Sequence, residues 1–214
     1  MHIPDGFLSP QTYLPAYVVA AGAWSWGTKG LRDSLDETTV PRLAMLTALA
    51  YGLGLVMVPI PGGTSGHALG IAILALVFGV RSAFVAYSLV LLLQSLLFGA
   101  GGITALAVNA LAMGLIGAAA AVATRNLLRG LGDTASIAIA AWVSVVVPGL
   151  LVAITLGIQP LVAHKSDGAP LFFPFGLSVT LPAVLIPHVV IGIGEAVLTV
   201  LVLRYVKSRK WSIV

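Results

Sequence analysis

Long apolar segments follow one another along almost the whole chain, and they constrain its fold more than any other feature. Of its 214 residues, 59% are hydrophobic and only 8% are charged, against roughly 25% charged in soluble domains. A helix needs about 20 apolar residues to cross a bilayer. The sequence therefore predicts an all-α, polytopic membrane helix bundle, with residues 1–214 as a single domain because no long polar segment could form a second one.

Seven apolar segments predict about seven transmembrane helices. They lie at about 11–28, 41–59, 67–80, 82–98, 103–123, 135–158 and 182–206. The third segment is too short to cross alone, and the prolines and glycines of residues 59–66 cannot continue a helix. Irregular backbone at membrane depth is tolerated only where protein buries it or where it lines a cavity. We therefore expect a glycine-rich re-entrant loop here, with His67 near the start of a half-length helix.

The basic residues predict how the chain is oriented. If the N-terminus lies outside and the C-terminus inside, ten of the 11 Lys and Arg residues face inward and only Lys165 faces outward, as the positive-inside rule requires. The net charge of +4 then reflects this asymmetry, and nucleic acid is not expected as a partner. Cysteine is absent, which excludes disulfides and cysteine-based metal clusters. No cleavable signal peptide is evident, so we expect Met1 to be the mature end.

The N-terminal segment, residues 1–10, carries the clearest chemical signal. The Met1 amine, the His2 amide nitrogen and His2 Nδ1 can close a five-membered and a six-membered chelate ring on one ion. Linked nitrogens of this kind tend to lie in a plane, which suits Ni(II) or Cu(II) better than zinc or magnesium. The segment is rich in apolar residues, so we expect it to tuck into the bundle. There the His67 imidazole could supply the fourth nitrogen of a square.

Further polar residues gather near the outer ends of the spans, where they could surround such a site. They are Asp5, Ser65, Gln94, Thr104, Asn109, His188 and Glu195. Gln94 and Asn109 could equally hydrogen-bond neighbouring helices, and Asp5 could serve only the local turn. Glu195 is the one acidic residue that we place within a span, which makes it a functional candidate or a helix-pinning group. His164 is expected to be a solvated loop residue.

The motifs together resemble the CbiM/NikM family, the membrane-embedded substrate-binding component of energy-coupling-factor transporters for nickel or cobalt. The resemblance covers nearly the whole chain and rests on Met1-His-Ile-Pro-Asp-Gly-Phe-Leu8, Thr64-Ser-Gly-His67, Leu93-Gln-Ser-Leu-Leu-Phe-Gly99, Gly101-Gly-Ile-Thr-Ala-Leu106, Asn109 with Met113-Gly114, and Pro187-His188 with Glu195. It implies that Met1, His2 and His67 bind the metal, with Ni(II) the first expectation and Co(II) the second. Ala100 and Ala112 depart from the family's usual acidic residue and asparagine, which thins the polar surroundings of the site.

The resemblance also implies partners in a prokaryotic plasma membrane. These are a transmembrane coupling subunit, ATPase subunits and a small accessory membrane subunit. The chain has no Walker motif, so it is expected to be a transporter subunit and not an enzyme.

Two other functions remain open from the residues alone. One is an intramembrane serine hydrolase that uses Ser65 with His67 or His188, although no nucleophile elbow precedes Ser65 and Met1-His2 would be left unexplained. The other is a structural membrane subunit, which would retain no stoichiometric metal.

Overall fold

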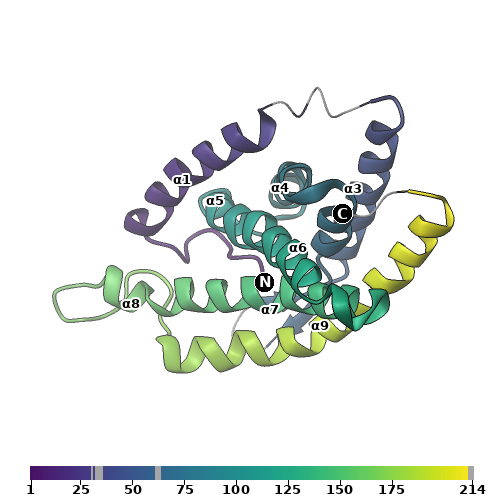
Figure 1. The fold of residues 1–214 in the computed structure, drawn as a ribbon. Coiled ribbons are helices and arrows are strands. Elements are labelled where there is room, and N and C mark those ends of the chain that lie inside the picture. The colour runs from purple at the N-terminus through teal and green to yellow at the C-terminus, as the bar shows by residue number, and fades with distance from the viewer. Residues whose placement is uncertain (30, 32–35, 61–63, 212–214) are drawn as a thin grey trace.

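A computed structural model describes residues 1–29, 31, 36–60 and 64–211, and nearly all of its regular structure is helical (Figure 1). The elements are α1 (Pro10–Thr28), α3 (Thr39–Leu55), β1 (Val58–Ile60), β2 (Thr64–Gly66), α4 (Ile71–Phe98), α5 (Leu106–Asn109), the π-helix η1 (Ala110–Ile116), α6 (Gly117–Leu127), the 3-10 helix η2 (Arg129–Leu131), α7 (Asp133–Gly157), α8 (Gln159–Val162) and α9 (Leu177–Ser208). The predicted all-α class is confirmed for the described residues, apart from one short hairpin.

Four helical stretches are long and apolar enough to cross a membrane. They are Ile71–Phe98, Leu106–Leu127, Asp133–Val162 and Leu177–Ser208, while α3 is apolar but shorter. The most extensive helix pair is α7 with α9, and α6 packs on both α7 and α4. The chain is therefore a helical membrane protein, whereas the count of seven spans and the orientation stay predictions.

The third and fourth predicted segments correspond to two helices that meet at a break within α4. α4 is broken at Gly79, whose φ of 78° and ψ of 170° are not helical. Its first part, residues 71–78, is the half-length helix that was expected after His67. Glycine readily adopts a positive φ, which explains how the backbone can break the helix at residue 79.

The polypeptide before His67 is not simply a dipping loop. β1 and β2 pair antiparallel, with Val58 opposite Gly66, and Val58 is 60% exposed. The expectation of a re-entrant glycine-rich loop is thus corrected in part. Two paired strands occupy 58–60 and 64–66, and the backbone that enters the bundle is residues 67–70. Residues 61–63 lie outside the described part of the chain.

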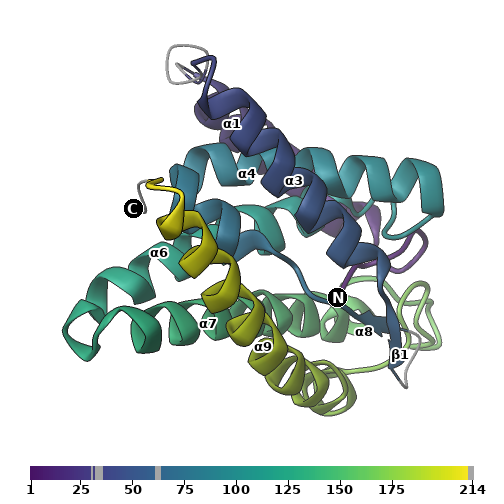
Figure 2. The same ribbon diagram turned by 90° about the vertical axis from the view of Figure 1, so that its right-hand side faces the viewer.

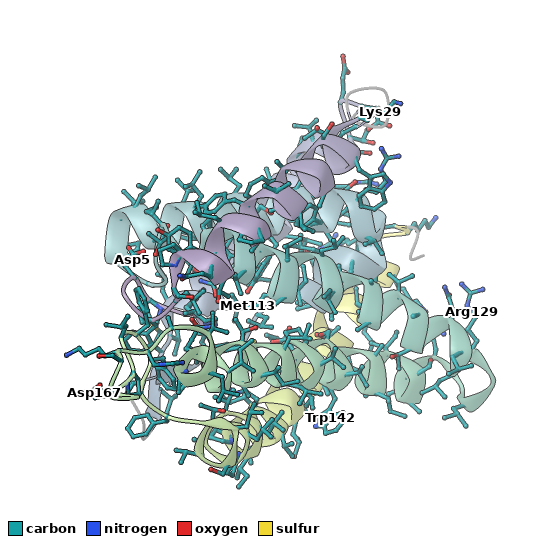
Figure 3. All side chains as sticks on the ribbon, turned by 90° about the vertical axis from the view of Figure 1, so that its left-hand side faces the viewer. Asp5, Lys29, Met113, Arg129, Trp142 and Asp167 are labelled. Atoms are coloured by element: carbon teal, nitrogen blue, oxygen red, sulfur yellow. The ribbon has the colours of Figure 1, made fainter. Side chains whose placement is uncertain are left out.

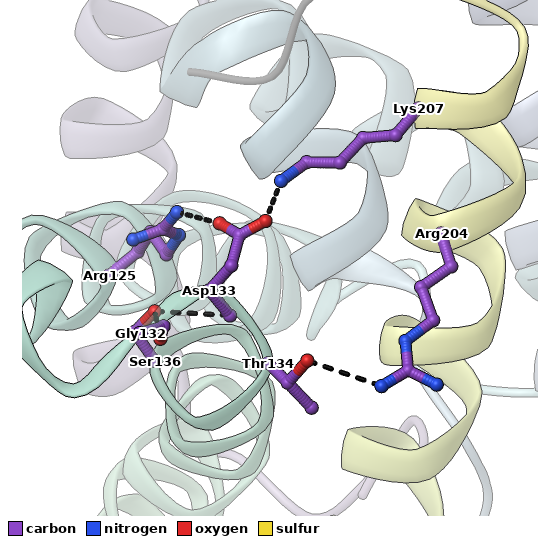
Figure 4. Close-up of polar contacts among 7 residues, drawn as sticks. All are labelled: Arg125, Gly132, Asp133, Thr134, Ser136, Arg204 and Lys207. Atoms are coloured by element: carbon purple, nitrogen blue, oxygen red, sulfur yellow. Dashed lines mark hydrogen bonds and ion pairs between the residues drawn. The ribbon is translucent and has the colours of Figure 1, made fainter.

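Two ends of the molecule differ in character. Figure 3 places Asp5 and Arg129 at opposite ends. At the Arg129 end, Asp133 forms ion pairs with Arg125 and Lys207, which join α6, α7 and α9 (Figure 4). These ion pairs lie at the surface, since half of the Asp133 side chain is exposed. Exposed ion pairs contribute at most about 1 kcal/mol to the free energy of unfolding. The buried polar side chains described below lie toward the Asp5 end.

Candidate metal centre

The N-terminal segment runs into the protein, and its first three residues are buried. Met1 and Ile3 are fully inaccessible and His2 is 7% exposed. Figures 1 and 2 both show the N-terminus among the helices and not at the edge of the molecule. A buried backbone needs hydrogen-bond partners, and the structure supplies them from the segment around α5.

Asn109 pairs with the backbone of Ile3 as a neighbouring strand would. The Ile3 amide donates to Asn109 Oδ1 at 3.0 Å, and Asn109 Nδ2 donates back to the Ile3 carbonyl at 3.1 Å. The Gly102 amide donates to the same carbonyl at 2.9 Å. Asn109 therefore holds the N-terminal segment directly and is more than a helix-to-helix contact.

Asp5 fixes the next part of the segment. Its carboxylate accepts the Ile103 amide at 3.1 Å and the Thr104 amide at 2.8 Å, together with the Thr104 hydroxyl. The Thr104 hydroxyl is the main reason that the pKa of Asp5 lies below its usual value. Asp5 thus ties the N-terminus to a loop about 100 residues away and does more than stabilise a local turn.

Two glycines allow this close approach. A Cβ on Gly102 would lie 2.3 Å from the Asp5 nitrogen, a distance that no side chain could occupy. Gly101 has a φ of +87°, and a Cβ there would lie 3.4 Å from His2 Cβ. The two glycines are therefore explained by contact of the 101–102 backbone with the N-terminal segment.

The two histidines of the predicted site lie side by side. His2 Nδ1 and His67 Nε2 are 3.1 Å apart, and the rings stack with their centroids 4.5 Å apart and their planes 18° from parallel. Imidazole nitrogens bind a divalent transition metal at about 2.0 Å, so neighbouring nitrogens in a square around the metal are about 2.8 Å apart. The observed separation is close to that value.

The tautomer of His67 follows from its other neighbour. His67 Nδ1 lies 3.0 Å from the Ala68 carbonyl oxygen. A carbonyl only accepts, so Nδ1 carries the proton and donates it, which leaves a lone pair on Nε2. That lone pair is on the nitrogen beside His2, as ligation of a shared ion requires.

The site is electrically neutral at its nitrogen atoms. Burial lowers the pKa of the Met1 amine to about 5. Burial, and then the positive charge of that amine, lower the pKa of His67 to about 3. At pH 7 the amine and the imidazole are therefore unprotonated, which is the form that binds metal. Among the described residues, no three His, Cys, Asp or Glu side chains cluster as a metal site.

Gln94 lies against His2. Its side chain is 1% exposed, and its Nε2 donates to the Tyr51 carbonyl at 3.2 Å. Neither Gln94 Oε1 nor His2 Nε2 has a hydrogen-bond partner among the described residues. Gly54 leaves the space for the Gln94 side chain, since a Cβ there would lie 2.3 Å from Gln94 Nε2. Gln94 is therefore a buried neighbour of His2, and its role at the site stays a prediction.

His188 and Glu195 are both fully buried on α9, as their spacing suggested. His188 Nδ1 lies 2.6 Å from the Val184 carbonyl. Its side chain lies next to Gly149, which also adjoins the terminal methyl of Met1. Glu195 accepts the backbone amides of Leu69 and Gly70, a role that no sequence signal revealed because backbone amides look alike in every residue.

Ser65, His164, Ala100 and Ala112 remain among the residues named from the sequence, and Ser65 has a side chain outside the described part of the structure. His164 is exposed, as expected of a solvated loop residue. Ala100 and Ala112, where the family usually has polar residues, are 8% and 5% exposed.

These features define a class: a helical membrane protein whose buried candidate site is formed by Met1, His2 and His67. The profile of the CbiM family, described as the cobalt uptake substrate-specific transmembrane region, matches residues 2–213. The chain belongs to this family.

Relatives with known names are transport proteins. The chain is 38% identical over 211 residues to the "Probable fused nickel transport protein LarMN" of Lactiplantibacillus plantarum, covering 97% of this chain and 64% of the relative. It is 37% identical to the "Fused nickel transport protein NikMN" of Rhodobacter capsulatus, covering 93% of this chain and 59% of the relative. This chain therefore spans about three fifths of these proteins.

A solved structure confirms the fold. The crystal structure of a truncated transition metal transporter matches with a TM-score of 0.94 at 39% sequence identity, and the match covers 98% of this chain and 99% of the other.

Proposed function

We propose that this chain captures a divalent transition metal as the substrate-binding component of an ATP-driven uptake transporter of the energy-coupling-factor type. The observation that carries this proposal is the 3.1 Å approach of His2 Nδ1 to His67 Nε2 in a buried pocket beside Met1. Ni(II) is the preferred substrate, and Co(II) is the alternative. The similar proteins named as nickel transporters support this order.

The ligands are the Met1 amine, the His2 amide nitrogen, His2 Nδ1 and His67 Nε2. Four strong nitrogen donors in a square favour Ni(II), whereas zinc prefers a tetrahedron. An ion shared by two imidazoles lies in the plane of both rings. Metal binding therefore turns one of the stacked rings, while the hydrogen bonds of Ile3 and Asp5 hold the segment in place.

Other subunits supply the energy. The chain lacks a Walker motif, so ATPase subunits, a transmembrane coupling subunit and a small accessory membrane subunit complete the transporter in a prokaryotic plasma membrane. Ser65 and His188 then have no hydrolytic role, and the hydrolase reading gains no support from relatives that are named as transporters.

The test is metal content and preference. The detergent-solubilised chain is equilibrated with equal Ni(II), Co(II) and Zn(II), separated from free ions and analysed for metals. We expect one metal per chain, with nickel ahead of cobalt and both ahead of zinc. A chain that retains no metal would instead support a structural subunit, and a preference for zinc would contradict the planar nitrogen site.

A further inference from the structure

We propose that Glu195 acts as a positioning residue for the metal ligand His67, through a single peptide group that joins the two. This inference rests on the proposed function, because it assigns a role in that same site. Glu195 is on α9 and His67 lies before α4, 128 positions apart in the sequence. The Ala68–Leu69 peptide group lies between them.

The contact of Glu195 with the backbone is two-pronged. One carboxylate oxygen accepts the Leu69 amide at 2.8 Å, and the other accepts the Gly70 amide at 2.7 Å. Glu195 is fully buried, and a buried carboxylate is costly unless it is hydrogen-bonded. Both oxygens act as acceptors, as an ionised carboxylate requires, and charged acceptors make the stronger hydrogen bonds.

The peptide group passes this interaction on to His67. The Leu69 N–H and the Ala68 C=O belong to the same peptide unit. While the N–H donates to Glu195, the carbonyl accepts the Nδ1–H of His67 at 3.0 Å. The order of groups is therefore Glu195 carboxylate, peptide N–H, peptide C=O, His67 Nδ1–H and His67 Nε2, which faces His2 Nδ1.

Hydrogen bonds in a chain polarise one another. The carboxylate draws on the peptide N–H, which increases the electron density on the Ala68 oxygen and strengthens its bond to His67 Nδ1–H. Metal-bound histidines commonly donate their second nitrogen to a carboxylate, which fixes the tautomer and raises the basicity of the ligand. Here a peptide group stands between the carboxylate and the histidine and serves the same purpose.

Gly70 makes the arrangement possible. Its φ is +69°, and a Cβ there would lie 2.9 Å from Ala50 Cβ. The turn thereby directs two successive amides toward one carboxylate at the start of α4. No side chain of residues 68–70 takes part, so the link between Glu195 and His67 runs through the backbone.

The test compares Glu195→Gln with the wild type. Gln keeps the size but offers one acceptor oxygen, and its NH2 group opposes one backbone N–H. We expect the affinity for Ni(II) to fall by about 10- to 100-fold, the usual effect of losing such an indirect partner. In 15N-histidine spectra of the metal-free chain, the Nδ1–H proton of His67 should move upfield, which reports a weaker hydrogen bond.

Thr199→Val is the matched control, because Thr199 is one turn further along α9, fully buried, and its hydroxyl has no hydrogen-bond partner among the described residues. It should leave both readouts unchanged. Glu195→Asp keeps the charge and should give an intermediate affinity, and it replaces the Gln variant if that variant does not fold.

Unchanged affinity and an unchanged Nδ1–H signal in the Gln variant would overturn the proposal. The proposal would also be overturned if Glu195→Asp lost as much affinity for Ni(II) as Glu195→Gln while its His67 Nδ1–H signal stayed at the wild-type position. Because the Nδ1–H signal is measured without metal, it tests the hydrogen-bonded link from Glu195 to His67 independently of nickel binding. A wild type that binds no nickel would overturn only the proposed function.

Discussion

Replacing His67 by Ala is expected to lower the affinity for Ni(II) by about a thousandfold, equivalent to about 4 kcal/mol. His67 supplies one of four nitrogens and is the only ligand outside the first two residues. The Met1 and His2 nitrogens would remain as a flexible chelate, so binding should weaken without vanishing. Isothermal titration of the solubilised chain measures the change, together with loss of the planar nickel absorption band.

His164→Ala is the matched control for this substitution. His164 is exposed and contacts the backbone of the next residue, so its replacement should leave affinity within about twofold, well inside the small effects of surface substitutions. Equal losses in the two variants would indicate adventitious binding to surface histidines and would contradict the site.

Gly102→Ala is expected to lower the affinity by roughly a hundredfold, although residue 102 is not a ligand. Its new methyl group would lie 2.3 Å from the Asp5 nitrogen, so the N-terminal segment must move. Overpacking costs about 1–3 kcal/mol and occasionally more, and the same movement would lengthen the hydrogen bond from the Gly102 amide to Ile3. Hydrogen exchange at residues 1–8 should rise together with the loss of affinity.

Gly52→Ala provides the control for Gly102. Gly52 is an exposed helical glycine on α3 with no atom within 4 Å of a built Cβ, so alanine should be neutral or stabilising there. Wild-type affinity in the Gly102 variant would show that the segment does not need its close contact with the 101–104 turn.

The helical class could be predicted from the sequence because it depends on local hydrophobicity, whereas the ligand set stays a prediction from local chemistry. Met1 and His2 are neighbours in the chain, so the expectation that their nitrogens share one ion does not depend on the fold. The prolines and glycines before His67 cannot continue a helix, which indicates that His67 lies near the start of the next one. The paired strands at 58–60 and 64–66 could not be predicted, because two strands of three residues beside prolines and glycines give almost no periodic signal.

The supporting contacts could not be predicted for a different reason. Asn109 and Gln94 were marked as polar residues in apolar helices, but their partners are the carbonyls or amides of Ile3 and Tyr51. Glu195 likewise binds amides 125 and 126 positions away. Backbone groups are identical along the chain, so only the fold shows which of them a polar side chain reaches.

The central claim is that the N-terminal amine is a metal ligand, and one measurement tests it most directly. The purified chain and a variant with one additional residue before Met1 are titrated with Ni(II), while absorption and magnetic susceptibility are recorded. The added residue moves the amine and leaves every side chain in place. We expect a diamagnetic, square-planar nickel spectrum at one equivalent in the original chain and its loss in the extended one. The same paramagnetic, octahedral spectrum in both chains would contradict the claim.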